Sequence, residues 1–172
     1  MIFRRTKDKD RQQVVELWQK ARTYFQEAGI DQWQDGYPNE ESLAEDMARG
    51  ESYVLADEEG GQVLATAFIS FAGEPDYERI YEGSWQSEGP YGVVHRVAVA
   101  PEQKGRGLAG RLIEQAEEMC RQRGVFSLRI DTHEDNRSMR RMLVKNGFSY
   151  QGIIYLGRGG DRRVAFEKKV TK

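Results

Sequence analysis

The feature that most constrains this chain is a glycine-rich segment between a strand pattern and a helix pattern. Lys104-Gly105-Arg106-Gly107-Leu108-Ala109-Gly110 follows a strand expected at 93–99 and opens a helix expected at 107–123. A helix N-terminus presents unpaired N–H groups beside the positive end of the helix dipole, and glycine lets the backbone approach an anion without a Cβ in the way. Three bases, Lys104, Arg106 and Arg111, add positive charge. The segment therefore predicts a turn that binds phosphate.

The hydrophobic pattern of the whole chain predicts a mixed α+β fold. Strands are expected at 2–5, 52–56, 63–71, 93–99, 127–131, 150–156 and 163–168, and helices at 8–28, from Asn39 onward, at 107–123 and at 135–146. Hairpins at both ends, the first turning at 58–61, and a strand–helix–strand unit in the middle imply a mixed sheet with helices on both faces. We expect one domain over residues 1–172, because no linker, repeat or low-complexity tract divides the chain.

Composition argues against several classes of protein. The 26 Lys and Arg residues against 28 Asp and Glu give a net charge of −2, which disfavours a nucleic-acid partner. No apolar run approaches the roughly 20 residues that span a bilayer, and the N-terminus lacks the apolar segment of a secretory signal. A single cysteine, Cys120, allows no internal disulfide, and two histidines without clustered spacing predict no metal site. We expect a cytoplasmic protein that binds no membrane, and homodimerisation stays open.

Two anion-binding arrangements compete for the glycine-rich segment. Gly105-x-Gly107-x-x-Gly110 matches the dinucleotide fingerprint, and Asp131 lies near the position of the ribose-binding acid. However, a polar spacer, residues 100–104, separates the strand from the glycines, whereas in a dinucleotide fold the turn follows its strand directly. The preceding segments also favour antiparallel hairpins. An NAD-dependent dehydrogenase is therefore the weakest alternative.

The segment resembles the central motif of the GNAT family of acetyltransferases. That motif is Arg or Gln, two residues, Gly, one residue, then Gly or Ala, after a strand and a spacer containing Pro. Gly107 and Ala109 match it, Pro101 lies in the spacer, and Lys104 replaces the first residue. A second family motif starts with Asn and ends in Gly-Phe, and here it runs from Asn136 to Gly147-Phe148. The resemblance implies a mostly antiparallel central sheet of about seven strands.

The resemblance also implies acetyl-CoA (CoA) as cofactor and an N-acetyltransferase as function. The pyrophosphate would lie on the amides of 105–110, the pantetheine arm would pair with the strand at 97–99, and Asn136 would support it or cap a helix. The cofactor residues so implied are Val97, Ala98, Val99, Lys104, Gly105, Arg106, Gly107, Leu108, Ala109, Gly110 and Asn136. The acceptor would be a primary amine of a small molecule or peptide. A non-catalytic acyl-CoA-binding sensor on the same fold is the alternative.

Direct attack of an amine on a thioester benefits from a base, from N–H donors for the developing oxyanion, and from an acid for the thiolate. Many family members place a tyrosine acid seven residues after the motif asparagine, where this chain has Leu143. Three explanations stay open: no acid is needed, Tyr155 or His133 replaces it, or this member has weak activity. His95, in the strand before Val97, is our first candidate for the base, and His133 is the second. A structural histidine and a local capping contact are the respective alternatives.

The acceptor is expected to meet two loops, residues 30–38 and 72–90. Both are rich in aromatic and polar side chains, and a connection as long as 72–90 inside a compact domain is usually functional or disordered. The candidate substrate residues are Gln32, Trp33, Tyr37 and Tyr81. Packing that only anchors the loops is the alternative for each of them.

Overall fold

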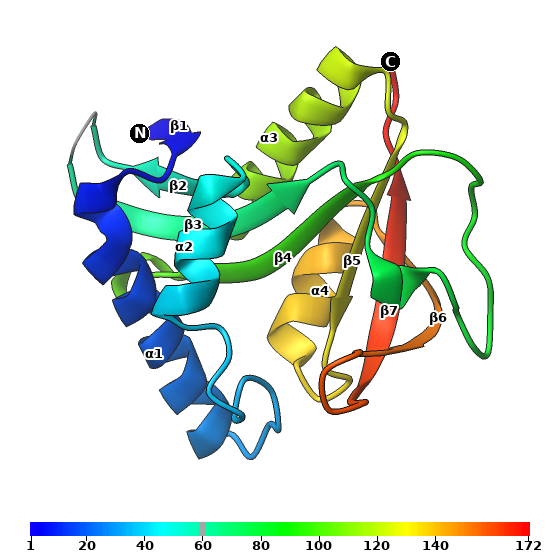
Figure 1. Ribbon diagram of the computed structural model, residues 1–172, viewed down its shortest axis with the longest axis horizontal. Coiled ribbons are helices and arrows are strands. Elements are labelled where there is room, and N and C mark those ends of the chain that lie inside the picture. Colours follow the sequence, from blue (N-terminus) through cyan, green and yellow to red (C-terminus); the bar gives the residue numbers. More distant parts are fainter. Residues whose placement is uncertain (59–60) are drawn as a thin grey trace. The chain divides into compact units, whose positions relative to one another are not determined.

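The computed structural model describes residues 1–58 and 61–172 (Figure 1). Within them the chain forms seven strands and four α-helices, in the order that the sequence predicts. The strands are β1 (Ile2–Arg5), β2 (Ser52–Ala56), β3 (Val63–Ser70), β4 (Gly92–Val99), β5 (Ser127–Thr132), β6 (Ser149–Tyr155) and β7 (Arg162–Lys169). The helices are α1 (Arg11–Glu27), α2 (Glu40–Ala48), α3 (Leu108–Arg123) and α4 (Arg137–Lys145).

The strands form one seven-stranded sheet in the order β1-β2-β3-β4-β5-β7-β6. The pairs β1–β2, β2–β3, β5–β7 and β6–β7 are antiparallel, and β4 pairs with β5 in parallel. In the described residues, the β4–β5 register covers Gly92 with Leu128 and Val93 with Arg129. The expectation of a mixed, mostly antiparallel α+β sheet is therefore confirmed.

The chain divides into two compact units, to both of which β4 contributes. The first consists of Met1–Ile69 and His95–Gln115, and the second of Ser70–Val94 and Ala116–Lys172. In the first unit α1 and α2, blue and cyan in Figure 1, are in contact. Their apolar faces pack with β2 and β4 in one core. This core consists of Val14, Leu17, Trp18, Leu43, Val54, Val63, Ala98 and Ala100. Organisation as one domain stays a prediction.

In the second unit the long connection between β3 and β4 is ordered and attached to β6. It contains a short 3-10 helix, Pro75–Tyr77, and then runs along the strand. Tyr81 and Ile153 exchange backbone hydrogen bonds of 2.8 Å in both directions, and the Ser84 N–H donates to the Gln151 carbonyl at 3.1 Å. A Cβ at Gly83 would overlap that carbonyl oxygen. Glycine is therefore required where the connection approaches β6 most closely.

Element boundaries follow the expectations with small shifts. The strands at 2–5 and 52–56 are confirmed to the residue, while the helix expected from residue 8 begins with a 3-10 turn, Asp8–Asp10, before α1. Asn39 caps α2 as expected, because its Oδ1 accepts the Ser42 N–H at 3.0 Å. The hairpin turn expected at 58–61 includes residues outside the described part of the chain. No helix among the described residues is long and apolar enough to span a membrane.

Candidate active site

The glycine-rich segment forms an open turn at the start of α3. Gly105 and Gly107 have φ angles of 83° and 72°, in the left-handed region that favours glycine. A Cβ built on either residue would have no atom within 4 Å, and residues 105–107 are exposed. The first helical hydrogen bond of α3 runs from the Arg111 N–H to the Gly107 carbonyl at 3.0 Å. The amides of 108–110 therefore precede the helical bonding pattern, as an anion site at a helix N-terminus requires.

Positive side chains flank this turn in the first unit. The Lys104 ammonium lies 4.2 Å from the ring centroid of Tyr24 on α1, and Arg106 donates to Gln103 Oε1 at 3.2 Å. Lys104 thus keeps a cation at the motif position where the family has Arg or Gln. The sequence-predicted phosphate residues are together in one turn.

The strand that leads to this turn, β4, has an irregular backbone at Arg96. Its φ of 52° is left-handed, which is uncommon for a residue with a Cβ. The burial pattern changes at the same place, because His95 and Arg96 are both half-buried and Val97 and Ala98 are both buried. Side chains therefore do not alternate through this segment, so His95 and Val97 do not share a face as residues two apart do in a regular strand.

His95 lies beside an aromatic ring of the neighbouring strand. Its imidazole stacks on Phe68 with ring centroids 5.6 Å apart and an interplanar angle of 17°. This contact fixes one ring face of a half-buried side chain, which suits a structural histidine. Its role as a base stays a prediction.

The loop before α2 is anchored by its own predicted substrate residues. Arg22 on α1 donates to the carbonyls of Trp33 and Pro38, at 2.9 and 2.6 Å. Trp33 packs edge-on against Phe25 with centroids 5.5 Å apart, and the Tyr37 hydroxyl accepts from Arg96 Nη1 at 2.6 Å. Gln32 is buried, with 8% of the residue exposed. These contacts support the anchoring alternative, and acceptor contact by these residues stays a prediction.

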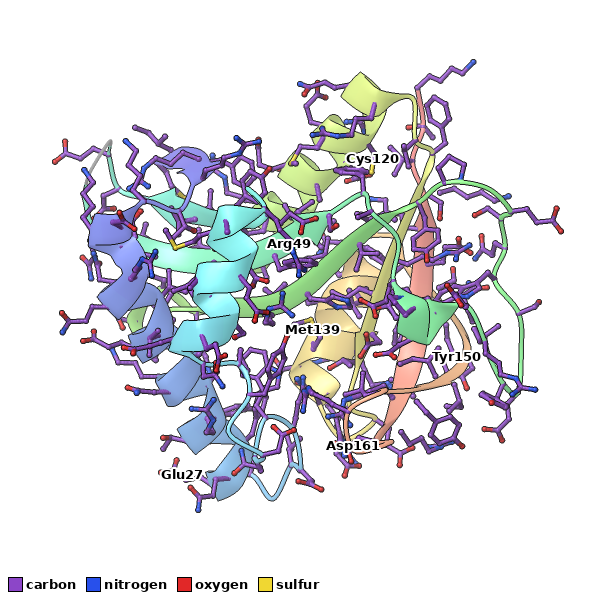
Figure 2. All side chains as sticks on the ribbon, in the orientation of Figure 1. Glu27, Arg49, Cys120, Met139, Tyr150 and Asp161 are labelled. Atoms are coloured by element: carbon purple, nitrogen blue, oxygen red, sulfur yellow. The ribbon has the colours of Figure 1, made fainter. Side chains whose placement is uncertain are left out.

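In the second unit, Asn136 and His133 shape the start of α4. Asn136 is buried, and its Oδ1 accepts the N–H of Met139, the α4 residue labelled in Figure 2, at 3.2 Å. The Asp135 N–H donates to His133 Nδ1 at 3.0 Å. Asn136 and His133 therefore both make the local capping contacts that were expected as alternatives to a role in the reaction. With Nδ1 accepting, a neutral His133 carries its proton on Nε2, which makes it better placed to donate than to accept.

Leu143, at the family's tyrosine position, is fully buried in α4. Its side chain carries no exchangeable proton, so this position supplies no acid. Tyr155, the candidate replacement, lies at the end of β6 and is 44% exposed. Its ring packs edge-on against Tyr81 at a centroid distance of 5.3 Å. The structure therefore brings together one predicted acid and one predicted substrate residue of the second unit.

A buried ion pair that the sequence did not reveal fixes the loop 72–90. Arg129 on β5 and Glu167 on β7 are cross-strand partners, and Arg129 Nε donates to Glu167 Oε2 at 2.9 Å. Arg129 Nη2 also donates to the Ser87 carbonyl at 2.8 Å, and its guanidinium lies 4.2 and 4.0 Å from the ring centroids of Trp85 and Tyr91. No local sequence signal marks the pair, because β5 and β7 each carry other charged residues besides Arg129 and Glu167.

Glu167 satisfies its oxygens through the same loop. The hydroxyls of Ser87 and Ser127 donate to it at 2.7 and 2.6 Å, and the Gln86 N–H is a further donor. Burial alone would raise the pKa of Glu167, but the hydrogen bonds from Ser127, Ser87, Arg129 and the Gln86 N–H outweigh it and lower the pKa below its ordinary value. Burial, together with the charge of Asp131, raises the pKa of Tyr77 well above its ordinary value. Tyr77 therefore stays a hydrogen-bond donor to Asp131, at 2.6 Å.

In the first unit a second buried pair holds β4. Arg96 donates to both oxygens of Asp46 on α2, at 2.8 to 3.1 Å. Burial raises the pKa of Asp46, and the neighbouring guanidinium offsets this only in part. In the described residues, no group of three or more His, Cys, Asp or Glu side chains could hold a metal ion.

Comparisons with known proteins identify the family. The model of the acetyltransferase (GNAT) family matches residues 13–148. This chain therefore belongs to the GNAT acetyltransferase family and is an acetyltransferase by class. The match includes the turn at 104–110 and Asn136, and it leaves the dehydrogenase alternative without support.

Related proteins agree with this assignment. The chain is 24% identical over 149 residues to the uncharacterized N-acetyltransferase YhfO of Bacillus subtilis, covering 86% of this chain and 89% of the relative. A crystal structure of a GNAT-family acetyltransferase from Streptococcus agalactiae is 30% identical, with a TM-score of 0.87 and coverage of 99% and 96%. A phosphinothricin acetyltransferase from Sinorhizobium meliloti, solved in complex with AcCoA, shares the fold at 16% identity, with a TM-score of 0.69 and coverage of 98% and 88%.

The Glu167 network predicts a pH-dependent stability. Because the folded pKa of Glu167 lies below the ordinary 4.5, its stabilisation is complete above that value and is lost as the pH falls through it toward the folded pKa. Replacing Glu167→Gln should cost about 3–5 kcal/mol near neutral pH, because it leaves the buried Arg129 without its counter-charge. Chemical denaturation between pH 7 and pH 3 measures both effects, and wild type should lose more stability on acidification than the variant.

The exposed Glu88 on the same loop supplies a control, since Glu88→Gln removes the same charge. It should change the free energy of unfolding by less than about 0.5 kcal/mol. Parallel acid-induced losses in wild type and Glu167→Gln would contradict the assignment of the pH dependence to Glu167.

Proposed function

We propose that this protein is an acetyl-CoA-dependent N-acetyltransferase whose acceptor is a primary amine of a small molecule or a peptide. The observation that carries the donor half is the turn before α3, with two exposed left-handed glycines and flanking cations at a helix N-terminus. Family membership supports the same donor. In this proposal the CoA pyrophosphate binds residues 104–110, and 97–99 hold the pantetheine arm through their backbone.

Bound acetyl-CoA supplies an activated acyl group as a thioester, and the chain's residues hold it and manage protons. Transfer forms an amide C–N bond and breaks the C–S bond, so the nitrogen loses a proton and the thiolate gains one. A lysine-like amine has a pKa near 10.4 and is about one part in a few thousand neutral at pH 7, so a base accelerates the reaction. His95 is the proposed base, and Tyr155 or His133 is the proposed proton donor.

The proposed acceptor residues are described within each unit by itself. In the first, the proposed acceptor residues are Gln32, Trp33 and Tyr37 in the loop 30–38. In the second, the exposed Tyr81 and Tyr155 form an aromatic pair with the carboxylates of Glu82 and Glu134 nearby, both bound to Arg162, at 3.5 and 2.7 Å. Aromatic faces and carboxylates suit a cationic amine before it loses its proton. A cytoplasmic location remains part of the same proposal.

Thiol release from acetyl-CoA tests this function. A library of small primary amines and of peptides with free N-termini or lysines is incubated with the protein and acetyl-CoA, and free thiol and acetylated product are both measured. At least one amine should give equal amounts of thiol and amide. The acyl-CoA sensor alternative, which Leu143 favours, predicts tight binding of acetyl-CoA with no turnover of any amine.

Donor binding should depend on the backbone of Gly107. Replacing Gly107→Val places a β-branched residue at a φ of 72°, which strains the turn and pushes a side chain toward the phosphate site. Calorimetric titration should show acetyl-CoA affinity reduced at least about 100-fold, and acetyl-CoA should no longer raise the Tm. Gly124 at the other end of α3 is a matched control, because it has a φ of 65° and equally open surroundings.

Gly124→Val should therefore lose similar stability and keep wild-type affinity for acetyl-CoA. Unchanged affinity in a folded Gly107→Val protein would place the pyrophosphate elsewhere.

A pH–rate profile should distinguish the roles of the two histidines. With one good acceptor, His95→Gln should lower kcat/KM on the order of 10²–10⁴-fold and remove the acidic limb of the profile, because the variant has no imidazole to accept the proton. His133→Asn keeps an oxygen that can accept the Asp135 N–H, so it should preserve the fold of this turn and that limb. An acidic limb that survives in His95→Gln would assign the base to another group.

A further inference from the structure

The backbone of β4 turns at Arg96, and this turn changes the direction of the peptide group between Arg96 and Val97. The indole N–H of Trp18, on α1, donates to the Arg96 carbonyl at 3.4 Å. A strand carbonyl ordinarily points sideways to a neighbouring strand, so this peptide is rotated toward the helix. Because a trans peptide holds its C=O and N–H in opposite directions, the Val97 N–H points away from Trp18. Arg96 is thus the residue that sets the direction of the first N–H of segment 97–99.

The side chain of Arg96 is held from three directions within the first unit. Asp46 on α2 accepts from Nε and Nη2, Tyr37 in the loop before α2 accepts from Nη1 at 2.6 Å, and the ring centroid of Phe68 on β3 lies 4.3 Å from the guanidinium carbon. The Arg96 and Asp46 side chains are 10% and 7% exposed. A planar group bound on its edge and its face has one orientation.

This arrangement explains why a left-handed position is occupied by arginine. If the turn required only backbone freedom, glycine would adopt this φ without strain. A strained conformation of a residue with a Cβ persists where its surroundings over-determine it. Here α2, the loop before it and β3 all contact the Arg96 side chain. Arg22 on α1 fixes the same loop by donating to the carbonyls of Trp33 and Pro38. The three contacts to Asp46, Tyr37 and Phe68 therefore act as a clamp on the backbone.

We propose that Arg96 is a positioning residue for acetyl transfer, and that its clamp by Asp46 and Tyr37 fixes the direction of the Val97 N–H toward the thioester carbonyl. The inference rests on the proposed binding of acetyl-CoA along 97–99. It goes beyond that proposal because it makes a helix residue, Asp46, and a loop residue, Tyr37, determinants of the chemical step through their contacts with Arg96. A donor that strengthens its hydrogen bond as the oxyanion forms affects kcat more than the binding of acetyl-CoA.

The test removes the clamp without leaving a buried charge unpaired. The double variant Asp46→Leu/Arg96→Met replaces the pair by apolar side chains, which buried ion pairs often tolerate. A matched control exists in the same unit, where Arg4 and Asp10 form another buried pair, 2.6 Å apart and 9% and 1% exposed. Arg4→Met/Asp10→Leu removes a pair of the same kind from a place outside β4.

Two readouts separate positioning from stability. The infrared band of acetyl-CoA labelled with carbon-13 at its thioester carbonyl reports hydrogen bonds to that oxygen in the bound state, and steady-state kinetics with one good amine gives kcat and KM. The clamp variant should keep the acetyl-CoA dissociation constant within about threefold, return the carbonyl band toward its position in water-free reference solution, and lose about 100-fold in kcat. The control variant should lower the Tm and leave band and kcat at wild-type values.

Arg96→Lys provides a second variant in case the double variant does not fold. Lysine keeps a cation for Asp46 but cannot bind Asp46 and Tyr37 together in a planar fork, so kcat should fall about tenfold and the band shift should be partly lost. A wild-type band and a wild-type kcat in either folded clamp variant would overturn the inference, and so would equal losses in the control.

The infrared measurement needs acetyl-CoA alone, so it stands apart from the choice of acceptor. If no amine is acetylated but the band shift depends on Arg96, the proposed transferase function fails, while the control of the Val97 N–H direction by Arg96 is supported. If amines are acetylated and the band is indifferent to Arg96, only the positioning role fails.

Discussion

The positions of both long loops depend on the constraint that a buried guanidinium must be fully paired. Moving an arginine out of water costs several kcal/mol unless its donors find acceptors in fixed places. Arg96 finds them on α2 and in the loop before it, and Arg129 finds them on β7 and at Ser87 in the connection before β4. In each unit a strand residue therefore selects the conformation of a segment distant in sequence.

The two ion pairs differ in how many hydrogen-bond donors their carboxylate receives. Glu167 collects four donors, so its pKa falls despite complete burial. Asp46 has a single guanidinium as its main partner, and burial raises its pKa. The carboxylate that anchors the loop 72–90 is thus stabilised by several donors, whereas the carboxylate of the pair at β4 depends mainly on the position of the Arg96 side chain.

Most of the fold followed from the apolar pattern, because α1 and α3 carry an apolar stripe and strands such as β2 and β3 are short apolar runs that are buried on both faces. The glycine turn was also predictable, since Gly105 and Gly107 occupy backbone conformations that other residues rarely adopt. The left-handed turn at Arg96 was not predictable, because nothing local in the sequence asks for it and only distant partners stabilise it. The Arg129–Glu167 pair was not predictable for the same reason, because the cross-strand register brings together two charges that lie far apart in the chain. Roles of His95, His133 and Tyr155 depend on bound substrates, which sequence patterns do not encode.

The close approach of Gly83 to β6 has a consequence for assembly. β6 is the last strand in the sheet order, and an edge strand offers its unpaired amides and carbonyls to any other chain. Residues 81–84 occupy part of that edge with hydrogen bonds to Gln151 and Ile153. At these positions the sheet cannot be extended by a second copy. The connection that the buried arginine secures therefore also protects the protein against edge-to-edge aggregation, and a loss of its anchor would expose the strand as well as the loop.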